Sequence, residues 1–394
     1  MSVSAAQSTR DVSPVAATSA RPAPDAAKKP SVAFLVSHSS AGGAQEIWAN
    51  LAEGFAARGY PSQLLALYPY RATIRESSDR LPWTYIVPER PTRPGAQLAM
   101  LKALVSYFRT TPPDVLFTAM PAANALAPVA ARLAGARTRI HTSHHSPVDT
   151  YNKALNVVDG WTGSIRNVQS VISVSRSVKG SLAKRSAGYQ DKVHVIYNAL
   201  PPQIEAHLEA LAHGRAGRAV GRRVVATGRL AAQKNYPTLI RAATHMPDVE
   251  IQIVGNGPDE AELKQLAQDL GVTDRVVFMG HRTRKEALEI LAAGDIFAQP
   301  SLFEGHSLGL IEAAKLGVPL VVSDVPVQLE GITAADGARC GIAVGTLDDA
   351  ALAREIRRLL DEPAHYQAMA AKARHLAEDI SFDAMIAQYE ALAS

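Results

Sequence analysis

Short apolar runs alternate with helical patterns along most of this chain, and this alternation is typical of parallel sheets covered by helices. In the first half the expected strands are 31–37, 62–68, 114–119, 139–143, 169–175 and 193–198, with helices near 44–58, 95–109, 122–134 and 176–187. The alternation resumes with strands at 224–228, 250–255, 275–280, 295–299 and 319–324, and the chain closes with two or three helices from about 348. The pattern predicts two doubly wound α/β units.

The two units are separated by residues 201–221, a polar stretch with Gly and Arg in which the alternation stops. A chain of 394 residues is longer than one hydrophobic core supports, so its length also predicts two domains. We expect a disordered tail over 1–30, rich in Ala, Ser and Pro, and a first domain over 31–200. The linker at 201–221 then leads to a second domain over 222–394, whose last helices return to the first domain.

The cysteine content and the lack of long apolar runs bear on the compartment. Cys340 is the one cysteine, so no intrachain disulfide can form, which favours a reducing environment. No run of about eighteen apolar residues occurs, and the first thirty residues hold no apolar core of a signal peptide. These features predict a cytoplasmic protein.

Charge is divided unevenly between the halves, although the net charge is only +4. Residues 31–200 carry 18 Lys/Arg against 9 Asp/Glu, whereas residues 201–394 carry 19 against 26. Either an ordinary solvated surface or an anionic membrane or acceptor docked on the first half accounts for this excess. The candidate cations are Arg71, Arg75, Arg80, Arg90 and Arg93 in one segment, and Arg176, Lys179, Lys184 and Arg185 along one expected helix.

Glycines follow two of the expected strands, at the sheet edge where open parallel sheets bind their ligands. Gly42 and Gly43 lie between a strand and a helix, where backbone N–H groups can hold a phosphate. Gly255 and Gly257 take the same position after a strand of the second half. A tight turn without a ligand explains either pair equally well.

Two cations follow the strand VVATG directly. Arg229 and Lys234 are five residues apart in a loop before a helix, so both can converge on one point at the sheet edge. Arginine can bind phosphate oxygens in a fork and lysine adds a compact charge. The pair predicts a phosphate site more strongly than it predicts two solvated loop residues.

Two carboxylates interrupt the apolar stretch PSLFEGHSLGLIEAAKLGVPLVVSD at 300–324. Burying an ionised carboxylate without a partner costs several kcal/mol, so Glu304 and Glu312 need a partner. Ser307 is the expected N-cap of the helix that carries Glu312. Neutral hydroxyls can satisfy such carboxylates without a buried countercharge, which indicates a sugar nucleotide, with ribose hydroxyls at Glu312 and the transferred sugar at Glu304.

The motifs GRLAAQKN, VGNGP and FEGHSLGLIEA, the last followed by GVPLVVSD, together resemble those of the retaining glycosyltransferases of family 4, which have the GT-B fold. The resemblance covers about residues 31–394 and is more specific in the second half. It implies two Rossmann-like domains, a donor held mainly by the second, an acceptor held mainly by the first, and catalysis in the cleft between them.

The resemblance also implies a role for each candidate residue. Arg229 and Lys234 would bind the donor diphosphate and stabilise it as leaving group, Glu304 would contact the donor sugar, and Glu312 would contact the ribose. Gly43 would lie against the phosphate from the opposite domain. The full set of implied donor-binding residues is Gly42, Gly43, Gly255, Gly257, Ser307, Leu308 and Glu312.

Members of this family often place a histidine after a strand of the first domain, close to the transferred sugar. In RIHTSHHSPVDTYNK the best match for this catalytic position is His144, with His145 next, whereas His141 is better explained as a structural residue. The chain departs from the commoner family pattern at His306, where an aromatic residue often stands, and at Gly309, where a larger apolar residue does. These departures leave the donor sugar open.

The predicted function is retaining transfer of a hexose from a UDP- or GDP-linked donor to a glycan or polyprenyl-diphosphate-linked glycan in polysaccharide biosynthesis. An anionic membrane surface is a further expected partner, and nucleic acid is not. The sequence holds no Cys/His cluster and no convincing pair of acidic ligands, so we expect no metal or other cofactor, the nucleotide sugar being a substrate.

Other functions compete with this prediction. A sugar-nucleotide epimerase of the same architecture would not need the Arg229 and Lys234 pair. A non-catalytic nucleotide-sugar-binding protein is disfavoured because these cations, Glu304 and Glu312 are all intact. A Rossmann dehydrogenase is disfavoured because no G-x-G-x-x-G follows the first strand.

Overall fold

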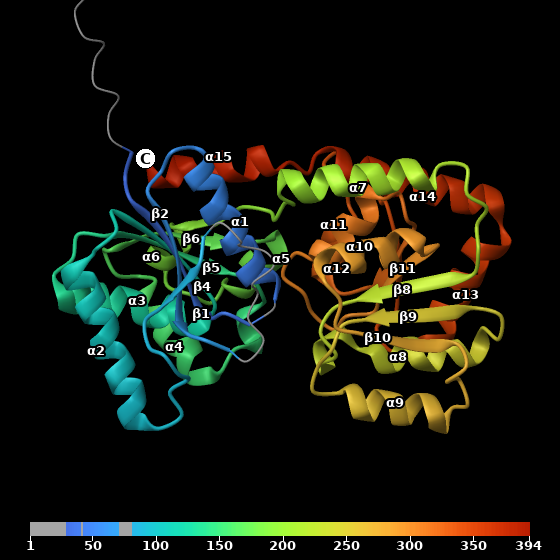
Figure 1. Ribbon diagram of the computed structural model, residues 1–394, viewed down its shortest axis with the longest axis horizontal. Helices are drawn as coiled ribbons and strands as arrows, with labels where there is room; N and C mark the ends of the chain where they lie inside the picture. The colour runs from blue at the N-terminus through green and yellow to red at the C-terminus, as the bar shows by residue number, and fades with distance from the viewer. Residues whose placement is uncertain (1–28, 41, 71–80) are drawn as a thin grey trace, which may run out of the picture.

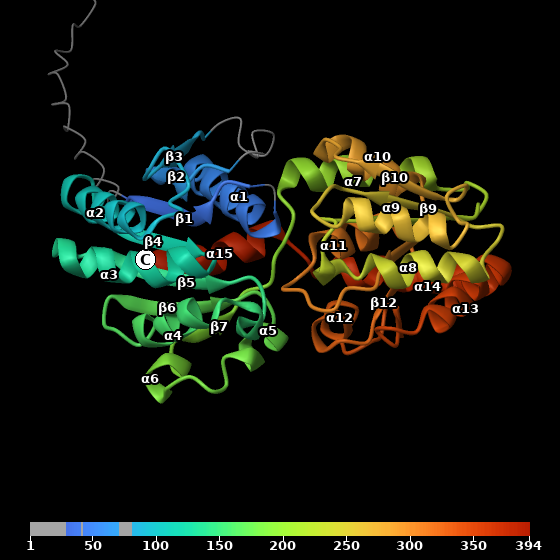
Figure 2. The same cartoon turned by 90° about the horizontal axis from the view of Figure 1, so that it is seen from below.

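The computed structural model describes residues 29–40, 42–70 and 81–394, and these form two domains, each built on one parallel sheet (Figure 1). The first sheet has seven strands in the order β3-β2-β1-β4-β5-β6-β7, and the second has six in the order β10-β9-β8-β11-β12-β13. Helices cover both sheets, as Figures 1 and 2 show. This arrangement confirms the predicted pair of doubly wound α/β units.

The first domain alternates strands with helices. Its strands are β1 (Val32–His38), β2 (Ser62–Tyr68), β3 (Trp83–Tyr85), β4 (Val115–Ala119), β5 (Arg139–His144), β6 (Val168–Ser173) and β7 (Val193–Val195). Its helices are α1 (Gly43–Ala57), α2 (Pro94–Thr110), α3 (Pro121–Ala134), α4 (Lys153–Thr162), α5 (Arg176–Ser181) and α6 (Ala187–Gln190), with a 3-10 turn at Val148–Thr150. The short strand β3 and the helix α4 have no counterpart in the sequence prediction. The helix expected over 176–187 is interrupted after α5, where Gly180 and Ser181 weaken it.

The second domain repeats the alternation. Its strands are β8 (Arg223–Thr227), β9 (Glu250–Val254), β10 (Val276–Gly280), β11 (Ile296–Gln299), β12 (Leu320–Ser323) and β13 (Ile342–Val344). Its helices are α8 (Tyr236–Ala242), α9 (Glu260–Asp269), α10 (Arg284–Ala293), α11 (Leu308–Lys315), α12 (Pro326–Gly331), α13 (Asp349–Asp361), α14 (Pro363–Glu378) and α15 (Phe382–Ala393), with 3-10 turns η2 (Ala232–Lys234) and η3 (Ala243–His245). Three helices close the chain after β13, in agreement with the sequence pattern.

The expected linker at 201–221 is largely helical. Helix α7 (Pro202–Arg215) packs against α10 and α11 of the second domain. Ile204, Leu208 and Leu211 lie on one side at helical spacing, and Leu208 is fully buried. These three large apolar residues make a narrow stripe among alanines, histidines and a few charged residues, so the helix gives only a weak signal in the sequence.

The last helix, α15, lies against the first domain although the chain reaches it from the second (Figures 1 and 2). A Cβ on Gly54 of α1 would lie 2.6 Å from Ile386 Cδ1, so the two helices are in close contact. Arg58 donates hydrogen bonds to Asp383 and Glu390, both at 2.6 Å. Apolar packing and ion pairs thus attach the end of the chain to the first sheet.

The strand order reverses between β1 and β4 in the first sheet and between β8 and β11 in the second. Open parallel sheets bind ligands outside the carboxyl ends of their strands at such a point. The carboxyl ends of the two sheets face each other, because a Cβ on Gly305, after β11, would lie 2.0 Å from the carbonyl oxygen of His145, after β5. Residues at both reversal points therefore belong to one interdomain region.

Candidate active site between the domains

Lys234 and Glu304 meet at the carboxyl ends of β8 and β11. The Lys234 Nζ lies 2.8 Å from Glu304 Oε1, and 15% and 9% of the two side chains are exposed. Gln233 donates to the other carboxylate oxygen at 3.3 Å. A Cβ on Gly228 would lie 2.6 Å from Lys234 Cε, so glycine leaves the space that the lysine occupies. Two predicted site residues are thus brought together, and Glu304 has a countercharge.

Arg229 lies at the same edge and is exposed, without an ion pair among the residues that the structure describes. The positive charge of Arg229 also acts on His38 of the first domain. Burial, and then the charges of Arg90 and Arg229, lower the pKa of His38 at the end of β1 to about 4. A neutral histidine near two guanidinium groups leaves net positive charge between the domains, which suits a diphosphate.

Glu312 lies on α11 and pairs with Arg284 at the start of α10. Arg284 also donates to Glu46, in the first turn of α1, at 2.7 Å. Burial raises the pKa of Glu312 to about 7, against the attraction of Arg284. Glu312 thus has a buried countercharge, supplied by a residue 28 positions away in the sequence that the sequence analysis did not identify. Arg284 connects the expected ribose site to the first domain.

Ser307 is the N-cap of α11, as predicted. Its hydroxyl accepts from Leu310 N at 3.4 Å and donates to Gln299 Oε1 at 2.9 Å. Leu308, the first residue of α11, is 9% exposed. Since α11 begins at the sheet edge that carries the Lys234 ion pair, the positive end of its dipole favours an anion there.

The departure from the family pattern at Gly309 has a packing reason. A Cβ on Gly309 would lie 2.7 Å from Thr227 Oγ1 and 3.3 Å from Phe297 Cζ. Glycine therefore lets the first turn of α11 lie directly on β8 and β11.

Gly255 and Gly257 allow two loops to pack closely against each other. Gly255 has a φ of 141°, and a Cβ there would lie 2.0 Å from Gly228 O. A Cβ on Gly257 would lie 2.1 Å from Leu230 O. Close backbone packing between the β8 and β9 loops thus explains both glycines without a ligand, and their contact with a donor stays a prediction.

The two candidate donor-binding glycines of the first domain, Gly42 and Gly43, differ from each other. A Cβ on Gly42 would lie 2.6 Å from Gln45 Oε1, in its own turn. A Cβ on Gly43 would meet nothing within 4 Å among the described residues. Gly43 therefore leaves its backbone accessible at the start of α1, beside the end of β1.

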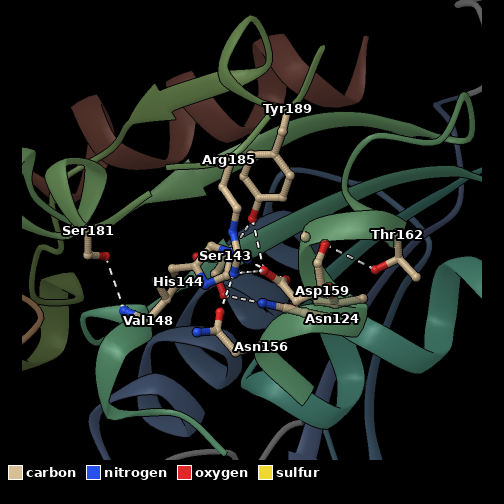
Figure 3. A network of polar contacts seen from close by, with 12 residues as sticks. Asn124, Ser143, His144, Val148, Asn156, Asp159, Thr162, Ser181, Arg185 and Tyr189 are labelled. Atoms are coloured by element: carbon tan, nitrogen blue, oxygen red, sulfur yellow. Dashed lines mark hydrogen bonds and ion pairs between the residues drawn. The ribbon is translucent and has the colours of Figure 1, made fainter. Parts of the chain in front are cut away.

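His144 lies inside the first domain (Figure 3). Its Nε2 is 2.8 Å from the Tyr189 hydroxyl and 3.5 Å from Asp159 Oδ1, and none of its side chain is exposed. Burial lowers the pKa of His144 although Asp159 opposes the shift. The structure does not bring this histidine together with the ion pair of the second domain. The ring is engaged on the side of α4 and α6, so this geometry gives no support to the predicted contact of His144 with the sugar.

His145 is nearer to the second domain, because its carbonyl contacts Gly305. Its ring packs edge-on against Trp48 with centroids 5.0 Å apart, and burial lowers the pKa of His145 to about 3. His141 pairs with Ser170 at 2.6 Å inside the sheet, as expected of a structural histidine. Of the three histidines, His145 therefore lies beside the interdomain region.

His306 connects the second domain to the chain that leaves the first. Its Nδ1 accepts from Asn198 N at 3.1 Å, and its carbonyl accepts from Asn198 Nδ2 at 2.9 Å. The ring lies tilted on Tyr197 with centroids 5.2 Å apart. Burial lowers the pKa of His306 to about 4, so the ring is neutral and can accept this hydrogen bond.

A further interdomain contact joins α12 to α5. Glu330 accepts from the backbone N–H groups of Arg176 at 2.6 Å and Ser177 at 2.8 Å. The hydroxyls of Ser177 and Tyr197 donate to it at 2.7 and 2.8 Å. Burial would raise the pKa of Glu330, but these hydrogen bonds outweigh it and lower the pKa. One carboxylate of the second domain thus satisfies four donors of the first.

Three other properties of the described residues add nothing to this site. Among the residues described, no group of three or more His, Cys, Asp or Glu side chains could hold a metal ion. None of the helices described has both the length and the apolar character needed to cross a bilayer. A cavity of about 990 Å³ between α7, α11 and α14 contains none of the predicted site residues.

The sequences of both halves of this chain match those of known protein families. The family model described as Glycosyltransferase Family 4 matches residues 41–203, and the model described as Glycosyl transferases group 1 matches residues 220–376. A GDP-mannose-dependent alpha-(1-6)-phosphatidylinositol monomannoside mannosyltransferase of Mycolicibacterium smegmatis is 31% identical over 268 residues, which cover 63% of this chain and 68% of that protein. The chain belongs to the glycosyltransferases.

A second relative supports this assignment, and a solved structure shows the fold. The lipopolysaccharide core biosynthesis glycosyltransferase LpsD of Rhizobium meliloti is 31% identical over 207 residues, 51% of this chain and 56% of that protein, so the chain spans about half of its length. The crystal structure of Anabaena HepE in complex with UDP and glucose has a TM-score of 0.75 at 20% identity, covering 92% of this chain and 98% of that one. This likeness confirms that the glycosyltransferase has the predicted GT-B fold.

Proposed function

We propose that this glycosyltransferase moves a hexose from a UDP- or GDP-linked donor to a glycan, or to a polyprenyl-diphosphate-linked glycan, with retention of the anomeric configuration. The carrying observation is the convergence of Arg229, Lys234 and Glu304 at the reversal point of the second sheet, facing the first domain. The complex of HepE with UDP and glucose and the name of LpsD support a nucleotide sugar and a surface polysaccharide.

In the proposed reaction the two cations stabilise the departing diphosphate. Arg229 and Lys234 lie where charge develops on the phosphate oxygen as the bond between that oxygen and the sugar C1 breaks. Lys234 exchanges its contact with Glu304 for the phosphate. Glu304 then accepts hydrogen bonds from hydroxyls of the transferred sugar, so neither charge is left buried without a partner.

Retention follows if the acceptor attacks from the face that the phosphate leaves. The electron pair of the broken bond goes to the phosphate oxygen, and the acceptor hydroxyl oxygen forms the new bond to C1. The acceptor proton passes to that phosphate oxygen, through a transition state with oxocarbenium character. His144 is buried against Tyr189 and Asp159, so it takes no part in the proposed reaction.

Glu312 is proposed to bind the ribose hydroxyls, together with Arg284. Arg284 already holds the Glu312 carboxylate and reaches Glu46 of the first domain, and this fixed orientation of the carboxylate supports the proposed role. Gly43, with open space beside its backbone, is proposed to lie against the phosphate from the other side.

The acceptor is proposed to meet the first domain, with the protein attached peripherally to the cytoplasmic face of a membrane. The excess of Lys/Arg in residues 31–200 supports an anionic partner. Three of the candidate cations of the first domain, Arg71, Arg75 and Arg80, lie outside the described residues. Arg185 turns inward to Asp159, so it is not part of a solvent-facing cluster.

We also propose that the reaction needs no metal, since Arg229, Lys234 and the start of α11 supply positive charge at the phosphate site. Addition of a chelator should leave the rate of donor turnover unchanged. A loss of rate that added divalent cation restores would contradict this.

The experiment that tests the proposed function is incubation with UDP-, GDP- and ADP-linked hexoses, followed by detection of released nucleotide. Transfer, or slow hydrolysis without acceptor, supports a transferase. NMR of the product then tests retention, because an α-linked donor should give an α-linked product. A changed sugar still joined to its nucleotide would identify an epimerase, and binding without reaction would identify a binding protein.

The donor base can be chosen beforehand by thermal shift. A ligand that binds only the folded state stabilises it by RT ln(1 + [L]/Kd), about 2.7 kcal/mol at one hundred times Kd. The nucleotide that raises the melting temperature most at equal concentration is the preferred donor base.

A further inference from the structure

Helix α4 turns its apolar side to the solvent. Ala154, Val157, Val158 and Trp161 recur at i, i+3, i+4 and i+7, the spacing that makes one continuous apolar stripe on a helix. Such a stripe normally packs into the core. Here Val157 is 72% exposed and Trp161 62%, and the other two residues are exposed as well.

The polar side of α4 is buried instead (Figure 3). Asp159, 1% exposed, accepts hydrogen bonds from Arg185 at 3.0 Å and from Tyr189 at 3.1 Å. Asn156 accepts a hydrogen bond from the same guanidinium. His144 Nε2 lies 3.5 Å from Asp159 Oδ1 and is hydrogen-bonded to the Tyr189 hydroxyl. Rotating α4 to hide its apolar stripe would separate a buried charge pair, which is strongly unfavourable.

Two glycines fix how closely α4 approaches this network. A Cβ on Gly160 would lie 2.6 Å from Arg185 Nη1. A Cβ on Gly163, just after the helix, would lie 2.2 Å from Tyr189 Cε2. These close contacts fix the orientation of α4, with its apolar stripe facing outward.

Exposed cations lie at both ends of α4 and in the segment against which it packs. Lys153 is the first residue of α4, Arg166 follows its end, and Lys184 adjoins Arg185, on which α4 packs. Residues 145–192 carry seven Lys/Arg against three Asp/Glu, and one of the three carboxylates, Asp159, is buried. The exposed apolar stripe thus belongs to a part of the chain with an excess of positive charge.

We propose that α4 docks this protein on an anionic lipid bilayer. The docking surface consists of Val157, Val158, Trp161, Lys153, Arg166 and Lys184. Tryptophan favours the level of the headgroups, and a helix with one apolar side and nearby Lys/Arg lies in the plane of an anionic membrane. The cations are attracted to the negative surface potential. This inference deepens the proposed function by naming the surface that brings the interdomain site to a lipid-linked acceptor.

The position of α4 fits this task. The helix begins a few residues after His145, whose carbonyl contacts the second domain. A bilayer at α4 is therefore close to the first-domain side of the site, where the acceptor is proposed to enter.

A second copy of the chain fits the same surface poorly. Stable protein interfaces bury about 1,000 Å² or more, and a ridge of four side chains on a ten-residue helix covers far less. An isologous contact through α4 would also place the same positively charged surface of both copies against each other.

The test is flotation of the full chain with vesicles of phosphatidylcholine, with or without phosphatidylglycerol, at low salt and without donor. We expect binding only with phosphatidylglycerol, and release at about 0.5 M salt. Trp161→Ala and Val157→Ser should each weaken binding about tenfold, as should Lys153→Glu combined with Lys184→Glu. Leu347→Ala, at a 76% exposed residue of the second domain, and Lys285→Glu, at an exposed lysine of α10, are matched controls that should bind normally.

Intrinsic fluorescence gives a second readout, because the chain has three tryptophans and Trp48 is fully buried. Emission should shift to shorter wavelength on anionic vesicles, and Trp161→Phe should abolish that shift while binding persists. Unchanged binding of Trp161→Ala, equal binding to neutral vesicles, or no shift would overturn the proposal. Dimerisation abolished by Trp161→Ala would also overturn it, in favour of a second copy.

The two proposals can fail separately. Thermal shift with the preferred nucleotide should be equal in all these variants and in the wild type, since α4 contributes nothing to the donor site. Vesicle binding without any donor binding would refute the proposed function alone, and donor turnover without vesicle binding would refute only the docking surface.

Discussion

Lys234 Nζ lies 2.8 Å from Glu304 Oε1, although the sequence assigns the first side chain to a departing phosphate and the second to a transferred sugar. A donor that uses both must separate the pair and satisfy each charge. A diphosphate at Lys234 together with sugar hydroxyls at Glu304 does so, whereas a phosphate alone leaves the carboxylate without its countercharge. The ion pair therefore favours a ligand that carries both groups.

Lys234→Ala should lower turnover by roughly a hundredfold to a thousandfold with saturating donor, as expected when a preorganised positive group is removed from developing charge. It should also lower the melting temperature, because Glu304 loses the countercharge that accompanies its burial. Steady-state kinetics and thermal unfolding measure the two effects.

Arg229→Ala is the matched comparison. Arg229 is exposed and has no ion pair within the described part of the chain, so its loss should reduce turnover by a similar factor while the melting temperature changes little. Near-normal turnover in either variant would remove that residue from the leaving-group site.

Glu304→Gln and Glu312→Gln should affect different kinetic constants. Contacts with the transferred sugar change during the reaction, so Glu304→Gln should lower kcat. Contacts with the ribose are the same in ground and transition state, so Glu312→Gln should chiefly raise the donor KM. Equal effects on both constants in both variants would contradict this division.

Donor affinity should rise with pH because of Glu312. Its pKa is raised to about 7, mainly by burial, so the carboxyl loses its proton as pH passes from 6 to 8. The ionised form accepts stronger hydrogen bonds from ribose hydroxyls, and Kd should fall by up to about tenfold over this range. Calorimetry with an intact nucleotide sugar avoids titration of a terminal phosphate. The same pH dependence in Glu312→Gln would assign the effect to another group.

The sequence predicted the second domain of the site best, because its signals are local. Strand ends can be read from apolar runs, and the residues that follow β8 and β11 necessarily meet at one edge of a parallel sheet. This places Arg229, Lys234 and Glu304 together, and the N-cap at Ser307 follows from its position before a helix. Each of these inferences needs only neighbouring residues.

Contacts that join the domains had no such signal. Arg284 pairs with Glu46 across 238 positions, and Glu330 contacts α5 across 154. Neither pairing follows from spacing or periodicity. His144 shows the same limit, because a histidine at a strand end can turn toward the ligand or toward the core, and a buried tyrosine 45 positions later holds it in the core.

Helix α4 carries a local sequence signal from which its orientation would be predicted wrongly. Its stripe at 154, 157, 158 and 161 indicates a helix, but the usual rule would place that stripe in the core. The buried Asp159 reverses the orientation, since a carboxylate paired with Arg185 inside the domain fixes the polar side inward. Side-chain pairing here overrides hydrophobic periodicity.

Glu330→Gln should loosen the contact between the domains. The carboxylate accepts four hydrogen bonds, and the amide that replaces it has one oxygen and an NH₂ group that faces backbone donors of Arg176 and Ser177. Loss of hydrogen bonds to a charged group costs about 1–3 kcal/mol, so the melting temperature should fall. Donor affinity should stay near normal because most of the proposed donor-binding residues, including Lys234, Glu304 and Glu312, lie on the second domain, whereas transfer to acceptor should slow.

The pH dependence of stability tests the same contact. The pKa of Glu330 lies below its ordinary value of 4.5, so its stabilising contribution is present above 4.5 and is lost as pH falls through the lower folded value. Glu330→Gln should therefore be less stable than the wild type at neutral pH, with the difference shrinking in acid. Glu289→Gln, at a half-exposed glutamate 3.9 Å from Lys285 on α10, is the control and should be neutral throughout. Parallel stability curves for Glu330→Gln and the wild type down to acid pH would show that this carboxylate does not hold the domains together.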